Sequence, residues 1–272
     1  MNEIIIQPNK GLRNFWSELW AYRELFYFLA WRDILVRYKQ TIIGIAWTVL
    51  RPLCSMIILT VVFGRIAKLP SNGVPYPVLV FSAMLPWQFF SGTLGMSSGS
   101  LISNRNMITK VYFPRIIIPS TAMVVSLVDF LISFVVLILL MLFYGVGVNW
   151  KIIVLPFLLI LSVLTSLGTG YWICAMNVKY RDFRHVMPFI IQFGLYLSPV
   201  GFSSSVVPAR WRLLYSINPM VGVIDGFRWA LTGEEVSLYL PGFLLSILIA
   251  ATLFITGAIF FTKTERKFAD II

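Results

Sequence analysis

Charged residues are scarce in this chain. Only 12% of its 272 residues are Asp, Glu, Lys or Arg, whereas a soluble domain carries about 25%. Hydrophobic residues make up 58% of the sequence, and the mean hydropathy is +0.85. This balance excludes an ordinary soluble domain and indicates a membrane protein.

Side chains that catalyse reactions or bind metals are nearly absent. The sequence has one histidine, His185, and two cysteines, Cys54 and Cys174, both inside apolar runs. H-E-x-x-H does not occur, and the presence of a single histidine argues against a metal site or a histidine-dependent triad. We therefore expect no catalytic residue, no metal and no cofactor on this chain.

A phosphate-binding loop is missing as well. No G-x-x-x-x-G-K-[ST] sequence is present, so ATP-driven work would need ATP and Mg²⁺ on a separate subunit. The net charge of +11 would suggest nucleic acid in a soluble protein, but in a membrane protein the positions of the charges matter more. No nucleic-acid partner is expected.

Long apolar runs dominate what is present. They lie at about 42–66, 76–100, 116–145, 152–176, 188–202 and 238–262. All but 188–202 are long enough to cross a bilayer as helices, which takes about 20 residues. The sequence therefore predicts an all-α membrane protein with a six-span transmembrane domain over 41–262 and a short fifth span.

The region 204–234 is too apolar for a free loop. It predicts two short helices, separated at Asn218-Pro219. Irregular backbone cannot face lipid. We therefore expect these helices to re-enter the membrane while buried against protein.

The distribution of basic residues predicts the orientation. Residues 1–41, 101–118, 177–188 and 262–272 carry 15 Lys and Arg residues, whereas the three alternate connections carry 6. The positive-inside rule places both termini in the cytoplasm, including 1–40 and the tail 263–272. The opening "MNEIIIQPNK" lacks the features of a signal peptide.

Residues 11–29 predict an amphipathic helix. Apolar side chains recur at helical spacing at Leu12, Phe15, Trp16, Leu19, Tyr22 and Phe26. With its tryptophans and flanking basic residues, this helix is expected to lie in the plane of the cytoplasmic membrane interface. A soluble helix docked on a partner is the alternative.

Two formal charges fall deep inside the predicted spans. Arg51 and Asp129 each follow a cytoplasmic basic residue by 12 to 14 positions, which places both roughly 20 Å deep. Because intramembrane charge is costly, it indicates pairing or function. One hypothesis is an Arg51–Asp129 pair that ties the first span to the third; the other is that Arg51 lines a transport path and meets an anionic substrate.

Aromatic residues make up 15% of the chain. They concentrate in "MLPWQFF" (84–90) and "QFGLYLSPVGF" (192–202), and aromatic rings can stack on sugars. The candidates for a saccharide path are Trp47, Trp87, Phe89, Phe90, Phe193 and Tyr196. For any single one of these residues, an interfacial belt or helix packing is the favoured explanation.

Two cytoplasmic connections are short and basic. They are "SNRNMITKVYFPR" (103–115) and "NVKYRDFRHVMPF" (177–189), which contains His185 near Asp182. Since no nucleophile is near, a catalytic role is rejected. Each could form a helical turn that fits a groove on a cytoplasmic ATPase; ordinary positive-inside charge is the alternative. Pro188 is expected to start the fifth span.

Several segments, in order, resemble one family. "WRDILVRYKQTIIGIAWTVLRPL" (31–53), "MLPWQFFSGTL" (84–94), "NRNMITKVYFPR" (104–115), "NVKYRDFRHVMPFIIQFGLYLSPVGF" (177–202) and "SINPMVGVIDGFRW" (216–229) are similar to permeases of ABC type-2 polysaccharide exporters, which export O-antigen, capsule or teichoic acid. The resemblance covers about residues 10–262.

The resemblance implies a homodimer in the inner membrane, docked to two copies of an ATP-binding subunit, that exports a lipid-linked polysaccharide. It implies coupling segments at 103–114 and 177–187 and a conduit lined by the first, second and fifth spans. The residues expected to contact the ATPase are Asn106, Lys110, Tyr112, Tyr180, Arg181, Asp182, Arg184 and His185.

A lipid pyrophosphate head would need cations near the inner interface. Arg37, Lys39 and Arg51, on the entry side of the first span, are the candidates, because guanidinium groups suit phosphate geometry. Two other functions stay open: an exporter for another amphiphile, such as a drug or lipid, and a membrane-embedded glycan enzyme.

Overall fold

The computed structural model describes residues 20–39, 44–71, 73–180, 182–233, 238–265 and 268. The described chain is all-helical, as predicted. Five of its helical stretches are long and apolar enough to cross a membrane. They are Ala46–Ile66, Tyr76–Ser103, Ile117–Phe143, Trp150–Lys179 and Leu240–Glu265.

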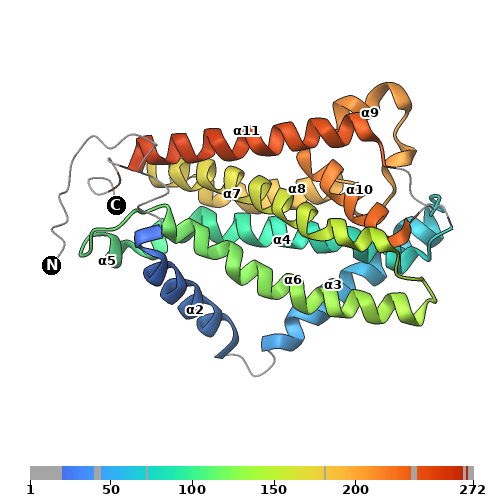
Figure 1. Cartoon of the computed structure of the whole chain (residues 1–272), viewed down its shortest axis with the longest axis horizontal. Helices are drawn as coiled ribbons and strands as arrows, with labels where there is room; N and C mark the ends of the chain where they lie inside the picture. The colour runs from blue at the N-terminus through green and yellow to red at the C-terminus, as the bar shows by residue number, and fades with distance from the viewer. Residues whose placement is uncertain are drawn as a thin grey trace.

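The long helices lie side by side along the long axis of the molecule (Figure 1). They are α3 (Gly44–Leu59), continued by a π-helical segment η2 (Thr60–Ile66), then α4 (Tyr76–Ser103), α6 (Ile117–Phe143), α7 (Leu155–Lys179) and α11 (Leu240–Glu265). Helix α4 lies at the centre and contacts α3, α6, α7, α8 and α10. The main hydrophobic core therefore forms around α4, with Phe81 and Phe89 fully buried in it.

Helices α7 and α11 cross very closely at two glycines. A Cβ atom on Gly168 would lie 2.5 Å from the Phe254 backbone nitrogen, and one on Gly257 would lie 2.3 Å from the Gly168 carbonyl oxygen. Small residues are what allow helix backbones to approach in a membrane, where packing rather than the hydrophobic effect holds helices together.

The N-terminal part of the described chain is helix α2 (Arg23–Lys39). The first part of the predicted amphipathic helix, residues 11–19, lies outside the described residues. Helix α2 extends ten residues beyond the predicted end at 29, and it packs against α6 (Figure 1). Its final turn, with Arg37 and Tyr38, therefore reaches the side of a long apolar helix.

Helix α8 (Phe183–Leu197) has 15 residues, a length of about 22 Å that falls short of a bilayer core of about 30 Å. It begins five residues before the predicted start of the fifth span at 188. Pro188 therefore lies inside the helix, not at its first position. A proline there removes only the hydrogen bond to the Arg184 carbonyl, in the exposed first turn, so the helix tolerates it.

The chain after α8 is irregular, and its carbonyl groups are held by side chains. Arg228, fully buried on α10, donates to the carbonyls of Val200 (2.9 Å), Phe202 (2.7 Å) and Leu79 (3.1 Å). The Tyr76 hydroxyl donates to the Gly201 carbonyl at 2.8 Å. Three consecutive carbonyls are thus satisfied without regular secondary structure, which is what irregular backbone needs at membrane depth.

The segment between α8 and α11 forms η4 (Ser204–Val206), α9 (Ala209–Tyr215) and α10 (Pro219–Thr232). The division at Asn218 agrees with the sequence: the Asn218 side chain caps α10 by accepting from the Met220 amide at 3.1 Å, and Pro219 fits the first helical position. Helix α9 lies at the end of the molecule opposite α5 (Arg105–Ile108) (Figure 1).

Candidate functional site

A cavity of about 620 Å³ opens among α3, α4, α6 and α8, beside the end of α2. Its lining mixes charged, polar and aromatic side chains. They include Arg37, Trp47, Thr48, Arg51, Gln88, Phe89, Ser91, Asp129 and Ser133. Asp129 lies 12 residues past the start of α6, about 18 Å along the helix, so the cavity is the main polar feature at membrane depth among the described residues.

The Asp129 carboxylate accepts from three different side chains. The Arg37 guanidinium forms an ion pair with it at 2.5 Å. The Tyr38 hydroxyl donates a short hydrogen bond to it, and the Thr48 hydroxyl lies at 3.5 Å. Burial and the bond to Asp129 raise the pKa of Tyr38 to about 12, so Tyr38 stays a protonated donor at neutral pH.

This arrangement corrects the predicted Arg51–Asp129 pair. Asp129 pairs with Arg37, and Arg51 lines the same cavity without an ion-pair partner among the described residues. The prediction failed because α2 continues to Lys39 and brings its last turn to α6, closer to Asp129 than the sequence suggested. The rival reading, in which Arg51 faces an open path, agrees with its position.

Lys39, the third predicted cation, is not at the cavity. It lines a shallow groove of about 300 Å³ on α2 with Phe28, Trp31, Arg32, Leu35 and Val36. Conversely, the sequence did not point to Thr48 and Gln88, which line the cavity, or to Tyr38, which donates to Asp129. Thr48 had a usable signal, because it lies three residues before Arg51 and so shares its helix face.

The six candidate aromatic residues separate into three groups. Trp47 and Phe89 line the cavity, and Phe193 and Tyr196 are exposed on α8. Trp87 is only 5% exposed and fits against Gly194 of α8, where an added Cβ would lie 2.7 Å from the ring, and Phe90 packs beside Trp87. Trp87 therefore fills the α4–α8 contact and is not among the residues that line this cavity.

Both predicted coupling segments lie at the same end of the helices, because α4 and α7 lie side by side and end there. The Asn177 amide on α7 donates to the Ser98 carbonyl on α4 at 2.8 Å. The exposed candidates at this end are Asn106, Lys110, Tyr112, Tyr180, Asp182, Arg184 and His185; Arg181 lies outside the described residues. This end therefore presents several polar and aromatic side chains to solvent.

Among the residues that the structure describes at this end, His185 and Asp182 meet no third group of a catalytic arrangement. The backbone amide of His185 donates to the Asp182 carbonyl at 2.9 Å, as in a helical turn. Within the described ranges, no three His, Cys, Asp or Glu side chains come close enough to hold a metal ion. A hydrogen bond near this end connects α2 to the segment beside α5: Arg32 on α2 donates to the Asn104 side chain, next to α5, at 2.9 Å.

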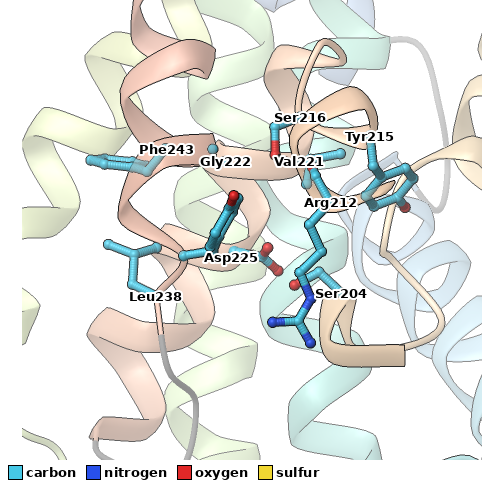
Figure 2. A pocket seen from close by; sticks show the side chains of 11 residues that line it. Ser204, Arg212, Tyr215, Ser216, Val221, Gly222, Asp225, Leu238 and Phe243 are labelled. Carbon is cyan, nitrogen blue, oxygen red and sulfur yellow. Dashed lines mark hydrogen bonds between the residues drawn. The ribbon is translucent and has the colours of Figure 1, made fainter. Parts of the chain in front are cut away.

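A second, much smaller cavity lies at the opposite end, between α9, α10 and α11. Figure 2 shows Arg212, Tyr215, Ser204 and Asp225 around it. Arg212 donates to the carbonyls of Ser205 (2.9 Å) and Val207 (3.0 Å). The volume of this second cavity, about 10 Å³, holds one water molecule at most, so it has no room for a substrate group.

Comparison with known proteins gives a consistent family. The family model described as ABC-2 type transporter matches residues 24–232. An O-antigen export system permease protein from Myxococcus xanthus is 26% identical over 94% of this chain and 98% of its own length. A second O-antigen export permease, from Klebsiella pneumoniae, is 26% identical over 89% of this chain and 92% of its own.

Capsule exporters are also related. The polysialic acid transport protein KpsM of Escherichia coli is 25% identical over 86% of this chain and 91% of its own length.

Proposed function

Because the chain belongs to the ABC-2 type transporter family, whose model matches most of its length, we propose that it is the membrane permease of an exporter for a lipid-linked polysaccharide of the O-antigen type. The observation that supports this choice of cargo is the end-to-end similarity to O-antigen export permeases. The chain is a multi-pass transport subunit, and ATP hydrolysis with Mg²⁺ belongs to a partner subunit.

The proposed topology has six spans with both termini in the cytoplasm of an inner-membrane protein. The five long helices cross the bilayer fully, and α8 is the short fifth span, whose length is completed by the irregular chain held by Arg228 and Tyr76. Helices α9 and α10 re-enter from the outer side. The end that carries α5 and Tyr180–His185 faces the ATP-binding subunit.

The cavity beside Asp129 is the proposed entry site for the lipid-linked head group. Arg37 and Arg51 line it, and guanidinium groups match phosphate oxygens in geometry and charge. Lys39 lies outside the cavity, on the exposed side of α2, and would meet the head group only before entry.

The sugar chain then follows a path between two copies of the protein. Helix α8 exposes Phe189, Phe193 and Tyr196 on one face, with the Phe189 and Phe193 rings stacked at 6.5 Å. Helix α3 exposes Trp47, which also lines the cavity. Exposed aromatic faces on these helices suit stacking on sugar rings once a second copy closes the conduit.

Reconstitution tests the function directly. The chain and an ATP-binding subunit of an O-antigen exporter that copurifies with it are expressed in a strain that makes O-antigen but lacks its own exporter. We expect surface polysaccharide to return, and to be lost when the phosphate-binding lysine of the ATPase is replaced. Failure of any ATPase to copurify, together with absent surface polysaccharide, would contradict the proposal.

A further inference from the structure

The charges around the cavity do not balance. Two arginines, Arg37 and Arg51, and one carboxylate, Asp129, line it. Asp129 forms an ion pair with Arg37 at 2.5 Å, and Arg51 has no ion-pair partner within the described ranges. Uncompensated charge at membrane depth is costly, so the cavity is built to receive about one further negative charge.

The groups on Asp129 are also the groups that bind phosphate. A guanidinium, a phenol hydroxyl and an alcohol hydroxyl, from Arg37, Tyr38 and Thr48, converge on one carboxylate. Guanidinium and hydroxyl donors are typical ligands of phosphate oxygens. Asp129 therefore occupies the donors that a phosphate group would use.

From this geometry we propose that Asp129 is an internal competitor that makes the cavity selective for highly charged phosphate groups; this inference rests on the proposed function. In the empty protein the Asp129 carboxylate holds the donors. A diphosphate carries enough charge to displace it and to engage Arg51 as well. A singly charged phospholipid head group offers no more charge than Asp129 and is rejected.

Such rejection matters because phospholipids surround the cavity at high concentration. Selectivity is a difference between two affinities, and a repulsive or competing group is an efficient way to create it. Asp129 would lower the absolute affinity for every anion while increasing the preference for the one that carries more charge.

The test measures two affinities in the same membrane. The complex with its ATPase is placed in phosphatidylcholine nanodiscs, and binding of a fluorescent polyprenyl diphosphate is measured with phosphatidylglycerol or inorganic pyrophosphate as competitors. For Asp129→Asn we expect about tenfold tighter binding of the probe, equivalent to about 1.4 kcal/mol, and new competition by phosphatidylglycerol. Unchanged or weaker binding, without competition, would overturn the inference.

The control is Asp33→Asn. Asp33 lies on the same helix as Arg37 but bonds Arg32 and Thr121, outside the cavity, so its loss removes an equal charge and should leave both affinities unchanged. Tightening in this control would show a general charge effect and overturn the inference. If Asp129→Asn does not assemble, Asp129→Thr is the second neutral variant, and Asp129→Glu should still exclude phosphatidylglycerol.

Two outcomes separate this inference from the proposed function. If Arg51→Gln binds the probe as well as the unmodified protein, the cavity is not the head-group site, and both the proposed entry site and the competitor role fail, whereas the exporter function is decided by the reconstitution. If Arg51→Gln weakens binding but Asp129→Asn does not change selectivity, only the competitor role fails. Equal displacement by inorganic pyrophosphate and by unlabelled polyprenyl diphosphate would indicate a free-phosphate site and overturn the lipid source.

Discussion

At the scale of single residues, Arg228 shows how backbone carbonyl oxygens can accommodate a buried cation. Its guanidinium is fully buried and donates to three carbonyls. Two belong to the chain after α8 and one to α4, so a single side chain joins three parts of the protein. Arginine suits this task because its planar fork presents several donors in fixed directions.

Replacing Arg228 with Met should destabilise the protein. Three buried carbonyls would lose their donor, at about 1–3 kcal/mol each, and removal of a buried charge would return part of that. We expect a net loss of roughly 2–4 kcal/mol, measured as a lower thermal unfolding midpoint in detergent.

Arg212→Met is the matched comparison for this change. Arg212 also donates to two carbonyls, but it is only half-buried, so water can replace it and the midpoint should shift less. The unfolding midpoint of Arg228→Lys should lie between those of the unmodified protein and Arg228→Met, because one ammonium group cannot reach all three carbonyls. Equal midpoints for the Met variants at 228 and 212 would contradict this account of the clamp.

At the scale of helices, the close crossing of α7 and α11 depends on the absence of side chains. Gly168→Ala should destabilise the protein, because the added Cβ would lie 2.5 Å from backbone atoms that cannot rotate away. Overpacking of this kind costs about 1–3 kcal/mol. Thermal unfolding in detergent is the measurement.

Gly99→Ala provides the control for helix propensity. Gly99 lies inside α4 with nothing within 4 Å of a new Cβ, so alanine there should be neutral or stabilise by up to about 1 kcal/mol. Should both alanine variants behave alike, the packing argument would be wrong.

The short helices at the cytoplasmic end are expected to transmit the ATPase motion. Reversing the exposed Arg184 to Glu should disrupt docking and uncouple ATP hydrolysis from export while the spans stay folded. Export and ATPase activity are measured together. Lys151→Glu, in the connection between α6 and α7 on the opposite side, is the charge-matched comparison and should leave both unchanged; export that survives Arg184→Glu would argue against this docking surface.

The sequence predicted helices better than their contacts. Apolar runs of 20 or more residues define spans almost by themselves, and Asn218-Pro219 marked the division between α9 and α10 because capping is a local effect. The Arg37–Asp129 ion pair could not be predicted from such local patterns in the sequence. It depends on where the end of α2 meets α6, and side-chain spacing within one helix carries no information about that meeting.

At the scale of the whole molecule, α8 exposes an aromatic face, which we propose a second copy of the chain covers. We expect two copies to meet near this face. In a variant without Cys54 and Cys174, Tyr196→Cys should form a disulfide-linked dimer on mild oxidation, detected on a non-reducing gel.

Leu248→Cys on α11 is the comparison for that experiment. Leu248 is 64% exposed and Tyr196 is 59% exposed, so reactivity alone would cross-link both equally. A dimer formed only through position 196 supports the arrangement, and one formed only through position 248 would place the second copy on α11.

The clamp on the chain after α8 also bears on how cargo preference can be exchanged between relatives. Its acceptors are main-chain carbonyls of Val200, Gly201 and Phe202, which most residues supply, whereas its donors, Tyr76 and Arg228, lie on other helices. Only Gly201 is constrained by its own size, because Phe63 lies against it. A grafted α8 should therefore be accepted wherever the recipient keeps those two donors and a glycine at the joint, which makes this helix a replaceable module for engineering chimaeric exporters.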